Sequence, residues 1–138
     1  MSITSVTHLN FRGQARGALT FYKLVFGGEL ITISYRQGNI VQSELEADQI
    51  LWGQVTSEDG FQIMAYDVPS SITLDRGVRP FYVSIRGNDE SEIKGYWEKL
   101  SEGADIIHEL ASAGWSPLYG MVKDKFGVIW VLDIAPSF

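Results

Sequence analysis

Few side chains in this sequence can do chemistry, and none of them stands in a recognisable catalytic pattern. The chain has two histidines, His8 and His108, and 0 Cys, which excludes disulfides, thiolate metal sites and cysteine nucleophiles. Its serines lack the His and Asp partners of a hydrolase motif, and no two carboxylates pair within one motif as a general acid and base would. Asp67, which precedes Val68 and Pro69, is typical of a structural turn.

Aromatic and methionine side chains at strand positions are the stronger signal, because small-molecule pockets are mostly apolar with a few polar groups. Strand alternation places the polar candidates on the face opposite Leu9, Phe11, Val83 and Ile85, which are expected to pack on helices. The aromatic residues would equally suit an ordinary core. The candidate ligand-binding residues are His8, Asn10, Met64, Tyr66, Tyr82, Ser84, Trp115, Tyr119 and Met121.

The elements that must position these residues are predicted from the hydrophobic period. In the first half, the apolar stripe of 13–26 predicts a helix, which the Gly27-Gly28 pair would end. Ser43 and Glu46 are compatible with a capping box that opens a short helical turn, or with a loop. Asp59-Gly60 is a hairpin signal. The predicted strands are 3–11, 30–35, 50–57 and 61–66.

The second half repeats this order at an offset of about 75 residues, which indicates an internal duplication. A strand at 81–86 precedes a helix at 88–102, and further strands are predicted at 104–110, 119–123 and 128–134. Two strand-helix-strand-strand-strand modules follow. We expect a single domain over 1–138, with module one at 1–68, a linker at 69–80 and module two at 81–138.

Composition and charge exclude several classes of partner. The chain of 138 residues carries 17 acidic and 11 basic side chains, a net charge of −6, whereas nucleic-acid binders carry the opposite balance. No apolar run approaches the length of a membrane span, and the N-terminus lacks the regions of a signal peptide. We therefore expect a cytoplasmic protein with neither nucleic acid nor membrane as partner. Exposed sheet edges favour a homodimer.

Four segments together resemble a known family. They are the opening 8–11, the helix and its cap at 18–28, the hairpin at 59–67 and the closing 119–130. They are similar to the PhnB-like branch of the vicinal oxygen chelate superfamily, which includes glyoxalases, bleomycin-resistance proteins and extradiol dioxygenases. The resemblance implies an α+β fold in which two βαβββ modules form a curved mixed sheet around a pocket, in a homodimer. A demethylubiquinone methyltransferase name is also applied to this branch, but no strand here is followed by the glycine-rich turn that would hold an adenosyl cofactor.

The resemblance also implies positions for metal ligands. His8 matches the first of them, but the others fall on Gly53, on Tyr82 or Ser84, and near Val131. None of these carries an imidazole or a carboxylate, and a stable site generally needs three or more protein ligands. Asp133 is the nearest substitute, and His108 is expected to be a surface residue of an edge strand. We therefore expect no metal and no other cofactor.

The leading hypothesis is a PhnB-like protein that binds a small organic molecule in an aromatic-lined pocket without metal. Whether it also turns that molecule over is left open. One alternative is a metal-dependent glyoxalase-like or dioxygenase-like enzyme that uses His8 as one ligand. Another alternative is a structural or regulatory dimer with no ligand.

Overall fold

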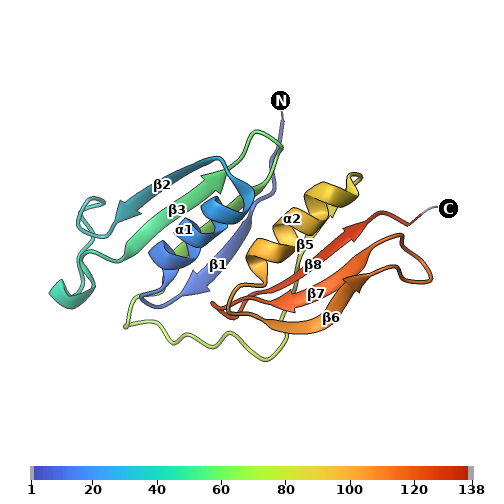
Figure 1. The fold of residues 1–138 in the computed structure, drawn as a ribbon. Coiled ribbons are helices and arrows are strands. Elements are labelled where there is room, and N and C mark those ends of the chain that lie inside the picture. The colour runs from blue at the N-terminus through green and yellow to red at the C-terminus, as the bar shows by residue number, and fades with distance from the viewer. Residues whose placement is uncertain (1, 137–138) are drawn as a thin grey trace. The chain divides into compact units, whose positions relative to one another are not determined.

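The computed structural model describes residues 2–136, and the chain divides into two compact units, Met1–Arg76 and Gly77–Phe138. These are the first and the second unit. Both are built in the same order, as strand, helix and three further strands (Figure 1). The two predicted βαβββ modules are thus confirmed, and each forms a four-stranded mixed sheet.

In the first unit the strands are ordered β1-β4-β3-β2. Strand β1 runs parallel to β4, and the other neighbours are antiparallel. Helix α1 lies on one face of this sheet and contacts β3, β4 and β2 (Figure 1). Within the described residues of this unit, no α-helix covers the other face. The elements are β1 (Thr7–Phe11), α1 (Ala15–Phe26), β2 (Glu29–Ser34), a 3₁₀ turn (Glu44–Glu46), β3 (Ile50–Thr56) and β4 (Gln62–Asp67).

Helix α1 forms because its apolar residues recur every three or four positions and bury one stripe against the sheet. It ends at Gly27, whose N–H donates to the carbonyl oxygen of Lys23 at 2.8 Å and whose φ of 77° suits glycine. At the other end, Gln14 gives no side-chain cap. The first N–H, that of Ala15, instead donates to the Asp67 carboxylate at 3.0 Å.

The second unit repeats this plan in the order β5-β8-β7-β6, with β5 parallel to β8. Helix α2 begins at an N-cap, Asp89, whose carboxylate accepts from the N–H groups of Ser91 and Glu92. The helix buries Ile93, Trp97 and Leu100 and contacts β8 and β5. The elements are β5 (Val83–Gly87), α2 (Glu90–Leu100), β6 (Asp105–Ala111), β7 (Tyr119–Lys123) and β8 (Ile129–Ile134).

The internal duplication extends to individual hydrogen bonds in the two hairpin turns. In the first unit the N–H of Ser57 donates to the oxygen of Phe61, and the N–H of Gly60 to that of Ser57. In the second unit Asp124 and Val128 make the first of these bonds, and Gly127 donates back to Asp124. Gly60 and Gly127 both have positive φ, 94° and 87°. The predicted Asp-Gly hairpin is confirmed.

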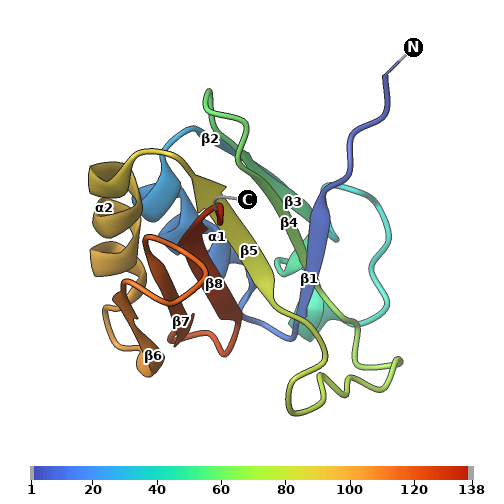
Figure 2. The same ribbon diagram turned by 90° about the vertical axis from the view of Figure 1, so that its right-hand side faces the viewer.

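Two local predictions in the first unit differ from the structure. The stretch 3–6 is not a strand, because within the described residues it has no partner in the first sheet, whose pairing begins at Thr7 with Ile63 (Figure 2). The helical turn after Ser43 is present, but Ser43 makes no side-chain cap. Glu46, the other half of the predicted capping box, instead accepts from the N–H of Ser70 at 3.1 Å.

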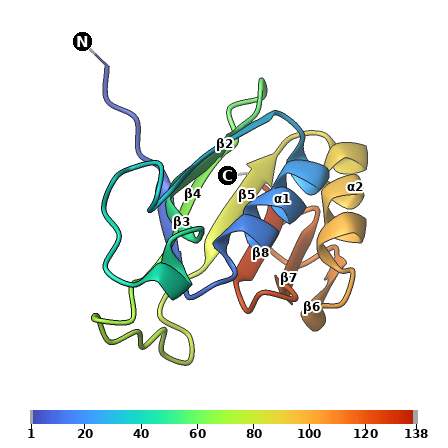
Figure 3. The same ribbon diagram turned by 90° about the vertical axis from the view of Figure 1, so that its left-hand side faces the viewer.

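The segment that follows β4 is held by the first unit. The N–H of Val68 donates to the oxygen of Phe11, and the Arg12 guanidinium donates to the carbonyl oxygens of Val68, Pro69 and Ile72. The loop between β2 and β3, teal in Figure 3, contacts the same segment through the bond from Ser70 to Glu46. The first part of the expected linker therefore belongs structurally to the first unit.

Candidate ligand-binding faces

The face of the first sheet that α1 leaves uncovered holds four of the predicted site residues. Pairing of β1 with β4 puts His8 beside Met64 and Asn10 beside Tyr66. The rings of His8 and Tyr66 meet edge to face, with centroids 5.1 Å apart. Leu9, on the opposite face, is buried. The predicted alternation along β1 is therefore confirmed, and it brings these four side chains together.

Gln54 also lies on this face, whereas the sequence comparison with the family aligned the metal-ligand position of this strand to its neighbour, Gly53. A Cβ on Gly53 would lie 2.5 Å from Cδ1 of Leu19, so position 53 faces helix α1 and not His8. The residue of β3 that pairs with Met64, and so lies in the row of His8, is Gln54. Strand alternation was the signal that could have found it, since Gly53 and Val55 are buried while Gln54 is half-buried.

The uncovered face of the second sheet gathers three further predicted residues in two neighbouring rows. Ser84 pairs with Val131, and Val131 with Met121. In the next row Tyr119 pairs with Asp133.

Aromatic rings extend this face at β6 and β7. The Tyr119 ring contacts Trp115 and His108 edge to face, at centroid distances of 5.1 and 5.2 Å. Trp115 is 57% exposed, a large fraction for so apolar a side chain. His108 lies exposed in an edge strand, as expected, but its contact with Tyr119 was not anticipated. Tyr82 was predicted in the strand with Ser84, but β5 begins only at Val83, so strand alternation does not place Tyr82 on this face. Its hydroxyl accepts from Arg79 at 3.2 Å.

Asp133 is committed to an ion pair and does not serve as a substitute metal ligand. Both of its oxygens accept from Arg86, from Nε at 3.0 Å and from Nη2 at 2.8 Å. The Asp133 side chain is 5% exposed and that of Arg86 54%. The hydrogen bond to Asp133 raises the pKa of Arg86 above its ordinary value, so the guanidinium stays charged. Sequence reasoning missed Arg86 because nothing local marks it.

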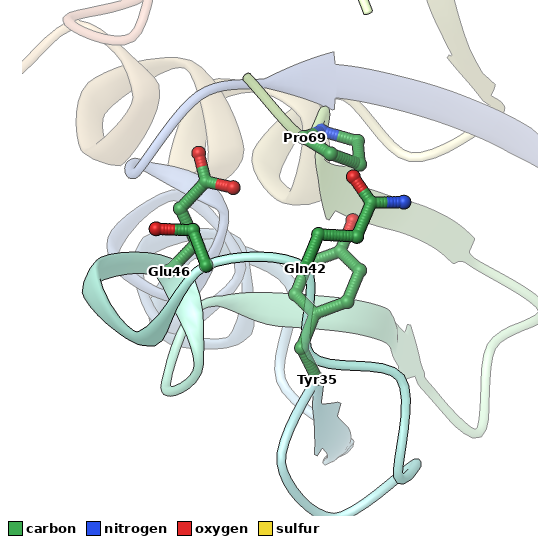
Figure 4. Close-up of a pocket in the computed structure, with 5 residues that line it drawn as sticks. Tyr35, Gln42, Glu46 and Pro69 are labelled. Atoms are coloured by element: carbon green, nitrogen blue, oxygen red, sulfur yellow. The ribbon is translucent and has the colours of Figure 1, made fainter. Parts of the chain in front are cut away.

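A small hollow of about 170 Å³ lies elsewhere in the first unit, lined by Tyr35, Gln42, Ser43, Glu46 and Pro69 (Figure 4). The Tyr35 hydroxyl donates to the carbonyl oxygen of Asp67 at 2.6 Å, and burial raises the pKa of Tyr35. That volume includes open solvent at the mouth, so the enclosed space is far smaller than an ordinary ligand pocket, which starts near 300 Å³. None of the predicted site residues lines it.

Asp67 has a structural role. Its side chain is buried, and its two oxygens accept from the N–H of Ala15 at 3.0 Å and of Ile50 at 2.9 Å. The carboxylate thus fixes the first residue of α1 and the first residue of β3. Its role is structural, as expected, but it is a long-range anchor and not a local turn residue, because its two donors lie 52 and 17 residues away in the chain.

The residues present do not fit a metal centre. Among residues 2–136 no three His, Cys, Asp or Glu side chains gather closely enough to hold an ion. His8 has Met64 and Tyr66 as neighbours, and the Gln54 amide donates to Thr56 and Gln62. A lone imidazole is a weak site for a divalent ion.

Comparison with known proteins places the chain in a family. A family model described as 3-demethylubiquinone-9 3-methyltransferase matches residues 3–132. The chain belongs to this PhnB-like family of the vicinal oxygen chelate superfamily. A search of the curated proteins gave no match. No helix in residues 2–136 has the length and apolar character needed to cross a membrane.

Solved structures share the fold. The PhnB-like chain is similar to protein PA1353 from Pseudomonas aeruginosa, with 24% identity over 99% of this chain and 100% of that one and a TM-score of 0.86. The PhnB protein from Bacillus cereus gives 24% identity, 96% and 100% coverage and a TM-score of 0.74. A mutant of the fosfomycin resistance protein FosX from Listeria monocytogenes, complexed with Mn(II) and dihydroxypropylphosphonic acid, gives 15% identity, 98% and 93% coverage and 0.64.

The methyl transfer in the family description would need a bound adenosyl cofactor, and the strand-to-helix turns of this PhnB-like protein do not fit one. After β1 the turn carries a single glycine, Gly13, and the first N–H of α1 is already bound by Asp67. After β5, two first-turn N–H groups of α2, those of Ser91 and Glu92, are bound by the Asp89 side chain. Glycine-rich turns with accessible N–H groups are what nucleotide-like cofactors require.

Proposed function

We propose that this PhnB-like protein binds a small organic molecule on the uncovered faces of its sheets, without a metal ion. The observation that supports it is the composition of these faces. In the first unit Met64, Tyr66 and Trp52 are half-buried, and His8 and Asn10 beside them are exposed. An apolar surface with a few polar groups is what a small-molecule site presents.

The burial of partly exposed apolar side chains on this face would favour an occupant. Each 100 Å² of apolar surface removed from water contributes about 2.5 kcal/mol, and Ile31, at the end of the His8 row, is 57% exposed. A flat organic molecule that covers such a row would gain this burial with no change of fold. The polar groups of His8 and Asn10 would fix its orientation through hydrogen bonds.

The experiment is a fluorescence titration with N-phenyl-1-naphthylamine, a neutral aromatic probe. We expect saturable binding to the wild-type protein, and affinity reduced severalfold in Met64→Ser, which removes an apolar side chain from the centre of the first face. Leu45→Ser is the matched control, because Leu45 is 94% exposed in the 3₁₀ turn. It removes the same kind of side chain from a site off both faces.

Two outcomes would overturn the proposal. If the wild-type protein shows no saturable binding, a dimer without ligand becomes the better account. If binding appears only after Mn²⁺ or Zn²⁺ is added and is lost in His8→Ala, the metal-dependent enzyme becomes the better account.

A further inference from the structure

The Arg86–Asp133 pair differs from a surface ion pair in the way its two partners are exposed. Asp133 is almost completely buried, at 5% exposure, while Arg86 is 54% exposed. The buried carboxylate holds the guanidinium through two parallel bonds, which fix the plane of the group. The buried Asp133 carboxylate therefore fixes the orientation of the Arg86 guanidinium, while the rest of the Arg86 side chain is accessible to solvent.

The two bonds to Asp133 leave other hydrogen-bond donors of Arg86 available. A guanidinium has five N–H groups, and Asp133 takes one from Nε and one from Nη2. In the part of the chain that the structure describes, Nη1 donates to no other group. Two N–H groups on Nη1 and one on Nη2 are thus left on an exposed side chain of an edge strand, β5.

An aromatic surface lies on the same face. Tyr119 shares the row of Arg86 through Asp133, and its ring contacts Trp115, an exposed indole. From β5 to β7 is two strand spacings, on the order of 10 Å. The side chains of β8 between them at this face are Asp133, already neutralised, and Val131, which is apolar.

From this arrangement, and resting on the proposed function, we propose that the second unit binds an aromatic molecule that carries an anionic group. The anion, a carboxylate, sulfonate or phosphonate, accepts from the remaining N–H groups of Arg86, and the ring system lies over Val131 and Met121 toward Tyr119. Charge-assisted bonds to a fixed guanidinium are strong and directional. In the first unit, the position that corresponds to Arg86 is Asn10, which pairs with Tyr66. Because Asn10 carries no charge, the preference for an anion is expected only in the second unit.

Long-range attraction does not explain such a preference. The chain has a net charge of −6, which repels anions at a distance. Selectivity for an anion must therefore come from contact with Arg86. This separates the proposal from a general electrostatic effect and allows a control with an equal change of charge.

The test compares two probes that differ by one sulfonate: 8-anilinonaphthalene-1-sulfonate and its neutral parent, N-phenyl-1-naphthylamine. We expect the wild-type protein to bind the sulfonate about tenfold more tightly than the parent. Arg86→Gln should bring the two affinities to within about threefold while binding of the parent is unchanged. Lys99→Gln, which removes the same charge from exposed Lys99 of α2, on the opposite side of the sheet, should alter neither affinity by more than about twofold.

Folding is controlled by the double variant Arg86→Gln with Asp133→Asn, which replaces the ion pair with two amides and leaves no buried unpaired charge. It should keep the wild-type circular dichroism and still lose the preference for the sulfonate. If the affinity ratio is the same in wild type and in both Arg86 variants, this inference is wrong, although binding of the neutral parent would still support the proposed function. If neither probe binds the wild-type protein, both proposals fail.

Discussion

Gly120→Ala is expected to destabilise the second unit because a methyl group at this position has no space. A Cβ at Gly120 would lie 2.8 and 2.9 Å from two ring carbons of Trp97 and 3.0 Å from Cα of Leu110. An indole and a backbone atom yield far less than a flexible chain end, so α2 or β7 must shift. Overpacking of this kind costs about 1–3 kcal/mol, and the reduced entropy of the unfolded chain returns up to about 1 kcal/mol. The net loss should be about 1–2 kcal/mol.

Gly95→Ala is the matched control, since it is the same substitution on the helix that packs against Gly120. A Cβ at Gly95 meets nothing within 4 Å, and alanine is favoured over glycine in a helix interior by about 0.5–1 kcal/mol. The two variants should therefore change the free energy of unfolding in opposite directions. They should also differ at the proposed site, because Tyr119 and Met121 flank Gly120 and only Gly120→Ala should weaken binding of the neutral probe.

The measurement is urea unfolding followed by tryptophan fluorescence. A separation of about 2–3 kcal/mol between the variants corresponds to midpoints roughly 1 M apart at the usual slopes. The packing argument is refuted if Gly120→Ala unfolds at the wild-type midpoint or above it. It is also refuted if both variants move the midpoint in the same direction.

Four further results are expected. Asp67→Asn should lower the free energy of unfolding, measured in urea, by about 1–3 kcal/mol, because one of two buried N–H groups loses its acceptor. The control Asp59→Asn, in an exposed turn, should change the free energy of unfolding by no more than about 0.5 kcal/mol. Equal effects of the two variants would contradict the role given to Asp67. Elemental analysis should find no stoichiometric Zn, Ni, Fe or Mn, and His8→Ala should melt at the same temperature with and without these ions; one metal per chain that is lost in His8→Ala would refute this. Light scattering at micromolar concentration should give a dimer mass, and a mass near 15.4 kDa would count against it. The bond from the Ser91 hydroxyl, with the N–H groups of Glu92 and Ser91, lowers the pKa of Asp89, so its stabilisation is present at neutral pH and lost as the pH falls through that lowered value. The gap in melting temperature between wild type and Asp89→Ala should therefore narrow as the pH is lowered below the ordinary aspartate range, and a constant gap would exclude this cause.

The hydrophobic period predicted most of the elements because each buries a single stripe or face. Helix α1 was predicted at 13–26 and lies at Ala15–Phe26, and β7 lies where it was predicted, at Tyr119–Lys123. The misplaced metal position at Gly53 shows the limit of this reasoning, because a shift of one residue moves a side chain to the other face of a strand. The hydrophobic period could not predict the Arg86–Asp133 pair, because the two residues are 47 positions apart and only the parallel pairing of β5 with β8 brings them together.

The contacts of Asp67 have a consequence for the order in which the first unit forms. Its carboxylate joins the start of α1, 52 residues earlier, to the start of β3, 17 residues earlier. On a ribosome, α1 and β3 are synthesised well before Asp67 leaves the exit tunnel, so neither can reach its final anchoring until β4 is complete. Contacts between residues so far apart in the chain slow folding because the closure of a long loop must come first. The first unit is therefore expected to assemble late and in one step, with β4 as the last strand to be placed.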